Sequence, residues 1–293
     1  MKRHVKWLLL ALSFACLAGT AGCGSSEEVT ADSFSTEEEV IPEEVEAEEP
    51  EEEEVEEVAP EGMYRSELTN EWISEDLKDQ RPIAVMVDNE KTALPHYGLS
   101  QADIVYEMMN STQNGQITRF MVLFKDYDSV SQIGSVRSVR PTNLMIAPEW
   151  NAIVCHDGGP FYINTFLAND YVDHFSGTFS RVDNGKPREF TEYILPGDME
   201  DNFSNSSIDR NYNEYAPTEP HFEFASESNP VDLSGEAGST ACTLVDLPFP
   251  HNGSELNYDE ASGTYLYSEY GSAHVDPGNN NQQLAFKNVI LQK

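Results

Sequence analysis

Residues 81–89 read RPIAVMVDN, and this stretch decides the fold of the chain. Its five apolar residues are bounded by Pro82 on one side and by Asp88 and Asn89 on the other. A short apolar run between such residues is typical of a buried β-strand. We therefore expect a strand that ends at two polar side chains.

Further apolar runs follow this strand. Asn114-Gly115 is a strong turn signal, and it predicts a hairpin that joins residues 105–109 to residues 117–124. Residues 152–155 predict another buried strand.

Two short helices are expected between these strands. One lies around residues 101–103, with Ser100 as its cap, and the other spans residues 161–169. The second helix should turn Phe161, Phe166 and Leu167 inward. Strands interleaved with short helices predict an α/β domain of the mixed α+β type over residues 63–200.

The character of the sequence changes after about residue 200. Residues 195–216 are rich in Asn, Ser and Asp, and we interpret them as a connection. Beyond them, turn residues separate short β-rich segments at 222–224, 242–247, 256–258, 264–267 and 284–291. This pattern predicts a mainly antiparallel β domain over residues 201–293. The apolar run 286–291 stands at the very end, so we expect this domain to be incomplete.

The N-terminus has the pattern of a bacterial secretion signal. Lys2, Arg3 and Lys6 precede an apolar run of residues 7–17, which is shorter than the roughly 20 residues needed to span a bilayer. Small residues then lead to Cys23, and Thr20-Ala-Gly-Cys23 resembles a lipobox in which Thr20 replaces the usual Leu. We expect a signal peptide over residues 1–22, a lipid on Cys23 and a location on the outer face of the membrane. The alternatives are an ordinary signal peptide and an uncleaved anchor.

Residues 23–62 predict a disordered acidic tether. Residues 24–62 hold 18 acidic residues and no Lys or Arg. Like charges and few apolar groups oppose folding and extend a chain, which here could reach roughly 130 Å. We interpret the segment as a spacer; a tail that binds cations or a partner is the alternative.

The remaining residues, 63–293, hold 14 basic and 34 acidic residues, a net charge of −20. Nucleic acids and anionic lipid surfaces are therefore disfavoured as partners, because the body offers them no extended basic surface. A local basic pocket remains compatible with this charge.

Arg137 and Arg140 are the sharpest candidate for such a pocket. They stand in the stretch SVRSVR, before Pro141, which suits the first turn of a helix. On a helix, a spacing of three residues places both on one face, where they could hold a phosphate or a carboxylate. Alternatively, they pair with internal acids such as Asp88 or Glu107.

Other candidate residues lie at strand ends. Ligands of α/β sheets bind at the carboxyl ends of strands. We therefore expect one ligand-binding cleft that includes the two arginines, with His156 either contacting the ligand or bonding only to backbone. The full candidate set is Asp88, Asn89, Glu107, Arg119, Arg137, Arg140, His156, Asp157, Gly158 and Gly159.

No complete catalytic, metal or cofactor motif is present in the sequence. The histidines are scattered without metal-ligand spacing, and we expect no cofactor and no zinc site. Cys155 and Cys242 could form a disulfide, but a buried free thiol is at least as consistent with the apolar surroundings of Cys155.

Several motifs resemble the YerB family of bacterial lipoproteins, a two-domain family of unknown function. They are RPIAVMVDN (81–89), GLSQADIVYEM (98–108), ITRFMVLF (117–124), IGSVRSVRP (133–141), CHDGG (155–159) and HFEF (221–224), with the hairpin-like segment 254–271 and the final KNVILQ. The resemblance implies a two-domain extracellular lipoprotein that lacks the end of its second domain. It departs at residues 181–193, where the family's Pro-His-Asn is absent, so no role can be carried over for that histidine.

Two hypotheses about function follow. In the first, the body is a non-catalytic module that binds an anionic envelope polymer or a partner protein near Arg137, Arg140 and His156. In the second, it is a cell-wall hydrolase in which Asp88, Glu107 or Asp157 serves as acid or base. We favour the first, because no motif supplies a complete set of catalytic groups.

Overall fold

The computed structural model describes residues 58–113, 115–226 and 228–292. These described residues form one compact unit. The predicted signal peptide, the lipid site at Cys23 and almost all of the predicted tether lie outside the described residues.

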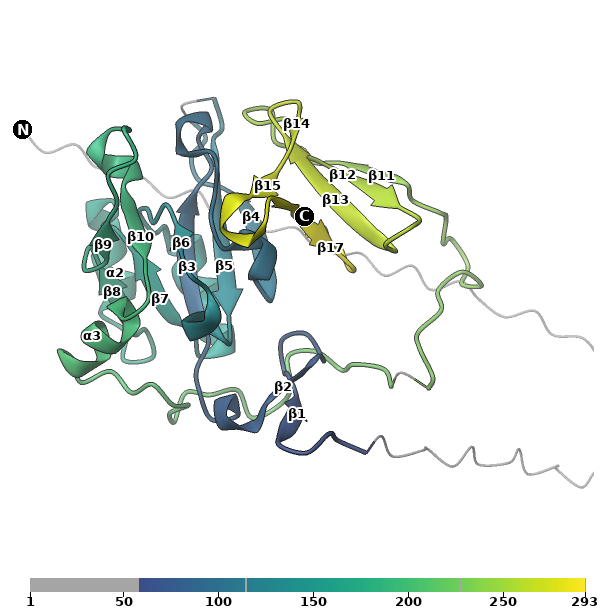
Figure 1. Cartoon of the computed structure of the whole chain (residues 1–293), viewed down its shortest axis with the longest axis horizontal. Coiled ribbons are helices and arrows are strands. Elements are labelled where there is room, and N and C mark those ends of the chain that lie inside the picture. The colour runs from purple at the N-terminus through teal and green to yellow at the C-terminus, as the bar shows by residue number, and fades with distance from the viewer. Residues whose placement is uncertain (1–57, 114, 227, 293) are drawn as a thin grey trace, which may run out of the picture. The chain divides into compact units, whose positions relative to one another are not determined.

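A mixed five-stranded sheet organises the first part of the body (Figure 1). Its strand order is β4-β5-β3-β7-β8, with β3 antiparallel to β5 and parallel to β7. The strands span Ile83–Asp88 (β3), Ile104–Met109 (β4), Thr118–Phe124 (β5), Ile153–His156 (β7) and His174–Ser176 (β8).

The central strand β3 is buried along its whole length, as residues 81–89 predict. Successive side chains of a strand point to opposite faces. Val85 and Val87 accordingly join one hydrophobic cluster, and Ala84 and Met86 join another. Each face of the sheet is therefore covered, which explains why the strand contains no polar residue before Asp88.

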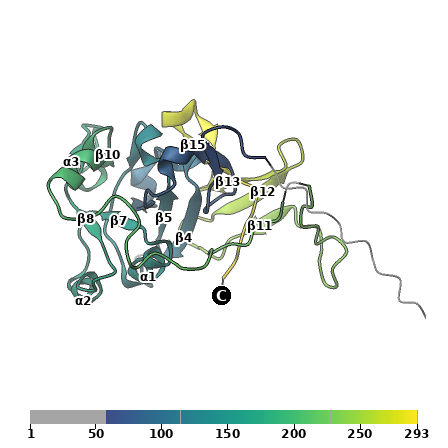
Figure 2. The same cartoon turned by 90° about the horizontal axis from the view of Figure 1, so that it is seen from below.

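Different elements cover the two faces (Figure 2). Helices α1 (Pro141–Ile146) and α2 (Asn164–Leu167) lie on one side. Strand β10 (Glu192–Ile194) and helix α3 (Asp198–Ser204) lie on the other. β10 belongs to a small sheet with β6 (Ile133–Gly134) and β9 (Ser180–Arg181).

The C-terminal region forms an antiparallel sheet, as predicted. Strands β11 to β14 follow one another in order, and β17 also pairs with β13. The bounds are Leu244–Asp246 (β11), Glu255–Asp259 (β12), Thr264–Glu269 (β13), Ser272–Ala273 (β14) and Ala285–Phe286 (β17). Two further hairpins join Met63–Arg65 (β1) to Trp72–Ser74 (β2) and Val275–Asp276 (β15) to Gln282–Gln283 (β16).

Side chains of the C-terminal sheet complete the core of the first. Leu256 and Tyr267 belong to the same hydrophobic cluster as β3 and β5. The ring of Tyr267 meets that of Phe120 edge to face, with centroids 5.9 Å apart. The mixed sheet and the C-terminal sheet therefore share one hydrophobic core.

Four local predictions were wrong in detail. Residues 222–224 form no strand, and only Ala285–Phe286 of the segment 284–291 is a strand. Ser100 lies inside a 3-10 helix that Gly98 caps in the left-handed conformation. Phe161 points outward with 86% of its surface exposed, because the predicted helix begins as a 3-10 turn that buries Ile163 instead.

The 3-10 helices are η1 (Glu75–Leu77), η2 (Lys91–Ala93), η3 (Leu99–Gln101), η4 (Tyr127–Ser129), η5 (Ala147–Trp150), η6 (Phe161–Ile163), η7 (Arg188–Phe190) and η8 (Pro277–Asn279).

Within the described part of the chain, we find no helix of the length and apolarity that a membrane span requires.

Truncating the centre of β3 should destabilise the whole unit. Met86→Ala removes a fully buried side chain, and we expect it to lower the free energy of unfolding by about 2–5 kcal/mol. Met145→Ala is the control, because Met145 is 64% exposed and its loss should change stability by less than about 0.5 kcal/mol. Urea unfolding of both variants measures the difference; equal effects would contradict the buried position of β3.

Candidate functional site

Asp88, at the carboxyl end of β3, is the centre of the candidate site. Its carboxylate is buried and forms ion pairs with two arginines. Arg119 stands directly opposite on β5, and its Nη2 lies 3.2 Å from Oδ2 of Asp88. Arg137 approaches the same oxygen with Nε at 2.5 Å. One buried carboxylate therefore holds two guanidinium groups.

The segment 135–140 crosses the carboxyl ends of the parallel strands β3 and β7. The amide of Arg137 donates to the carbonyl of Met86, and the amide of Asp157 donates to the carbonyl of Arg137. The amide of Asp88 donates to the carbonyl of Ser135. The chain between the strands is thus fixed on both sides by backbone hydrogen bonds.

The two arginines of this segment do not lie on a helix face, contrary to the helical alternative. Arg140 has an extended backbone and immediately precedes α1, whose first residue is Pro141. The side-chain oxygen of Asn143 accepts a hydrogen bond from the Arg140 amide at 2.9 Å. Pro141 does occupy the first helical turn, so the arginines are positioned by the strand ends instead of by the helix.

Arg140 is half-buried and has no carboxylate partner among the described residues. Its Nη1 donates to the carbonyl of Val139 at 3.0 Å. Burial and the neighbouring charge of Arg137 lower the pKa of Arg140. Burial also lowers the pKa of Arg119 to about 10. The carboxylate of Asp88 opposes this decrease, and the positive charges of Arg140 and Arg137 add to it. We call Arg119, Arg137 and Arg140 the arginine cluster; positive charge is concentrated there.

Other carboxylates touch the cluster only at its edge. Nη2 of Arg137 contacts the exposed Glu189 at 2.9 Å. Asp157 is held by Arg181 at 2.9 Å, and Arg181 also pairs with the fully buried Glu192. Burial and the nearby Asp157 raise the pKa of Glu192. These acids lie in or near the stretch 181–193, and sequence reasoning did not identify Arg181, Glu189 or Glu192.

Two exposed aromatic rings belong to neighbouring residues of η6. Phe161 is 86% exposed and Tyr162 is 49% exposed, and their rings meet edge to face at 5.6 Å. Tyr162 is near enough to Arg140 to oppose the lowering of the pKa of that arginine. They follow Gly158 and Gly159, so the glycine loop leads directly from β7 to an exposed apolar patch.

His156 does not reach the arginine cluster. Its Nδ1 lies 2.8 Å from the carbonyl of Gly158, and its Nε2 lies 3.1 Å from Nδ1 of His174. Burial lowers the pKa of His156 to about 4. The ring is therefore neutral and internally bonded, to the backbone as one alternative expected and also to His174, which neither alternative included.

The two glycines after Asp157 have different roles. Gly158 has a φ of +67° and open space where a side chain would stand. A side-chain carbon on Gly159 would lie 2.3 Å from Cδ1 of Ile163. Gly158 can therefore expose backbone to a ligand, whereas Gly159 is required by internal packing.

Asn89 and Glu107 belong to a second polar cluster. Asn89 donates to Glu107 and to Thr118, at 3.2 and 2.8 Å. Asn252 and Tyr267 of the C-terminal region donate to Glu107 at 2.7 and 3.0 Å. The structure thus brings Asp88 together with Arg119, Arg137 and Arg140, and it turns Asn89 and Glu107 toward the C-terminal sheet.

Comparison with known proteins adds the family. Residues 68–210 match the N-terminal domain, and residues 245–293 the C-terminal domain, of "Protein of unknown function (DUF3048)". The chain belongs to the YerB-like two-domain family. It is 26% identical over 239 residues to "Putative lipoprotein YerB" of Bacillus subtilis (strain 168), covering 78% of this chain and 66% of that protein. The chain thus spans just under two thirds of the length of that relative.

A solved structure also resembles this YerB-like chain. The crystal structure of the YerB protein from Bacillus subtilis has a TM-score of 0.59 and 25% identity, covering 76% of this chain and 72% of that one. The resemblance expected from the motifs is therefore confirmed, as is the fold class. The family description contains no reaction, so function must be argued from the site.

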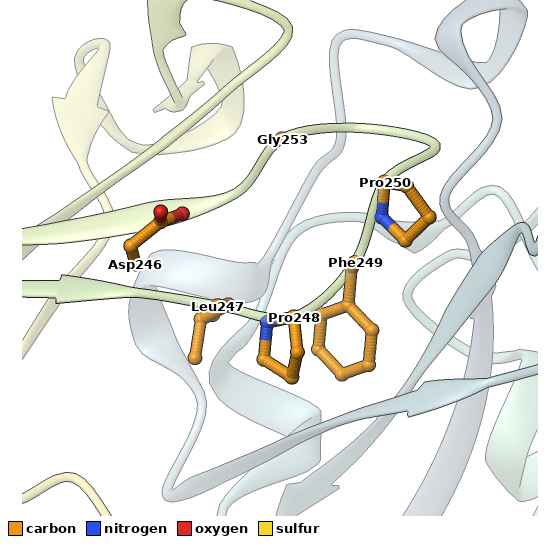
Figure 3. A pocket seen from close by; sticks show the side chains of 6 residues that line it. All are labelled: Asp246, Leu247, Pro248, Phe249, Pro250 and Gly253. Carbon is orange, nitrogen blue, oxygen red and sulfur yellow. The ribbon is translucent and has the colours of Figure 1, made fainter.

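Neither the two described cysteines nor a surface hollow next to β11 adds a candidate site. Cys155 is a buried free thiol and Cys242 an exposed one. The hollow beside the turn that joins β11 and β12 contains none of the candidate residues (Figure 3). Its lining is Asp246, Leu247, Pro248, Phe249, Pro250 and Gly253.

The buried, neutral His156 predicts a loss of stability in acid. Its pKa is about 4 in the folded chain, against an ordinary value of 6.5. The unfolded chain therefore takes up a proton first, and stability falls as pH decreases from about 6.5 to about 4. His156→Gln should reduce this slope, measured by urea unfolding across that range. His221→Gln, at an exposed ring, is the control, and an unchanged slope in His156→Gln would contradict the assignment.

Proposed function

We propose that this YerB-like chain is an extracytoplasmic lipoprotein, anchored through Cys23, that binds a phosphate-bearing envelope polymer at the arginine cluster. The N-terminal motif and the lipoprotein name of the relative support the anchor. A non-catalytic binding role agrees with the site, where three arginine side chains gather around the buried carboxylate of Asp88.

The unpaired charge of Arg140 carries the proposal. Asp88 is shared by Arg119 and Arg137, and Arg140 has only a backbone carbonyl as partner in the part of the chain that the structure describes. A guanidinium donates up to five hydrogen bonds in a planar fork that matches phosphate oxygens. Partial burial strengthens such a contact, because less water screens it.

The rings of Phe161 and Tyr162 suggest which kind of phosphate is bound. Exposed apolar patches often mark interaction sites. A free phosphate would not use them, whereas a polymer with sugar or polyol units between phosphates would present apolar faces to the rings. We therefore favour a phosphodiester-linked envelope polymer over a partner protein as the ligand.

The hydrolase alternative receives less support from the geometry. Burial opposes the change, but hydrogen bonding with Glu192 and Arg181 and the charge of Arg181 lower the pKa of Asp157, so Asp157 is unsuited to donate a proton. Burial raises the pKa of Glu107, but Thr118, Ser254 and three other side chains already donate to its oxygens. Asp88 is held by two guanidinium groups.

Removing the lipid site should release the protein from the membrane. Cys23→Ala prevents lipid attachment, so we expect the variant in the soluble fraction while the unaltered chain sediments with membranes. Cys242→Ala is the matched control and should remain in the membrane fraction. Retention of Cys23→Ala in the membranes would refute the lipid anchor.

Arg140→Ala should weaken polymer binding. A hydrogen bond to a charged group is worth about 1.5–3 kcal/mol, so we expect a loss of roughly 10- to 150-fold in affinity. Arg188→Ala changes net charge equally at an exposed position outside the cluster and should retain binding. Isothermal titration with a purified wall phosphodiester polymer measures both variants.

Two further results would discriminate between ligands. Equal weakening by Arg140→Ala and Arg188→Ala would show that only net charge matters and would refute the site. If Phe161→Ala leaves polymer affinity unchanged while Arg140→Ala abolishes it, the ring contacts are wrong and a simple anion is the ligand.

A further inference from the structure

Three buried residues meet at the junction of the two family domains, one from the N-terminal domain and two from the C-terminal domain. His96 follows η2, Glu269 ends β13, and His274 lies between β14 and β15. Each offers one ligand atom, and these atoms all lie within 4.8 Å of one another. His96 is 0%, Glu269 2% and His274 4% exposed.

The hydrogen bonds of this cluster leave ring nitrogens unused. Nδ1 of His274 lies 2.8 Å from Oε1 of Glu269, and Asn252 donates to Oε2 of Glu269 at 3.2 Å. Nε2 of His274 and both ring nitrogens of His96 have no hydrogen-bond partner, although they are shielded from solvent. A buried polar atom without a partner costs about 1–3 kcal/mol, so a group that satisfies these nitrogens is expected.

The ring of His96 stays neutral, because burial lowers its pKa well below the ordinary value. The nearby backbone carbonyl of Asp88 would raise this pKa, but its effect is smaller than that of burial, and it makes no hydrogen bond with the ring. His274 and Lys186 add to the decrease caused by burial. A neutral imidazole keeps a free lone pair on one ring nitrogen, and histidine binds metals in this neutral form.

We propose that His96, Glu269 and His274 bind one divalent transition-metal ion, with Zn²⁺ as the preferred ion. Two imidazoles and a carboxylate are a ligand set that Zn²⁺ uses with a fourth position left open. Nδ1 of His274 and Oε1 of Glu269, now 2.8 Å apart, would both bond to the ion in place of bonding to each other.

Metal binding requires a small closure of the site. Ligands of a tetrahedral Zn²⁺ lie roughly 3.4 Å apart, given bonds of about 2.0–2.1 Å. The three side chains therefore move together by at most roughly 1.4 Å. His96 belongs to the segment matched by the N-terminal family domain, and the other two ligands belong to the C-terminal one. A bound ion would thus fasten these two domains together.

The test is metal binding by the full chain in detergent, without a histidine tag and after treatment with a chelator. We expect one Zn²⁺ per chain by elemental analysis, a raised melting temperature on adding Zn²⁺, and a tetrahedral absorption spectrum with Co²⁺. His96→Gln and His274→Gln should each weaken Zn²⁺ affinity by about 100-fold or more. His174→Gln, at the other buried histidine pair, is the matched control and should keep one ion.

Glu269→Gln keeps the size of the side chain and provides a variant that should fold even if the histidine variants do not. It should retain the circular dichroism of the unaltered chain and lose the tetrahedral Co²⁺ spectrum. The absence of stoichiometric Zn²⁺ at 100 μM free metal would overturn the proposal. A second contradicting result would come from crystals grown with Zn²⁺. Electron density between the three side chains that gives no zinc anomalous signal would mean that a buried water, and not a metal ion, bonds to the ring nitrogens.

Discussion

The buried ion pair of Asp88 with Arg119 is the interaction on which the site depends. It stands at the end of the β3–β5 ladder, where the two residues are direct partners. Arg137 adds a second cation to the same oxygen, so the segment that crosses the strand ends is held by charge as well as by backbone hydrogen bonds. Removing one member of a buried pair typically costs 3–5 kcal/mol, because the remaining charge loses its partner. Here the loss of Asp88 would leave the buried Arg119 without a carboxylate and Arg137 with only the exposed Glu189.

Much of the fold could be predicted because its signals are local. The all-apolar run of β3 and the Asn114-Gly115 turn depend on neighbouring residues, and they lead to the observed strands β3, β4 and β5. Phe161 shows where prediction from local signals fails. This apolar residue fits a helical pattern, but it lies in a 3-10 turn that directs its side chain outward, and sequence periodicity does not distinguish such a turn from an α-helix.

The candidate site was predictable only in part, for a related reason. Asp88, Arg137 and Arg140 share the edge formed by adjacent strand ends, which a strand assignment implies. Asn89 follows Asp88 directly, yet it bonds to Glu107 under the C-terminal sheet. The meeting of His96 with His274 depends on the docking of segments more than 170 residues apart, and no spacing in the sequence encodes it.

The shared hydrophobic core also constrains the order of folding. Leu256, Tyr267 and Leu284 belong to the cluster that covers one face of β3 and β5. A growing chain that ends before β12 would therefore leave the ring of Phe120 without the rings of Tyr267 and His274, although the neighbouring strands β3 and β4 are already present. Contacts between residues so distant in sequence form late, and exposed apolar surface in the interval favours aggregation. The body must therefore emerge almost entirely before it becomes stable.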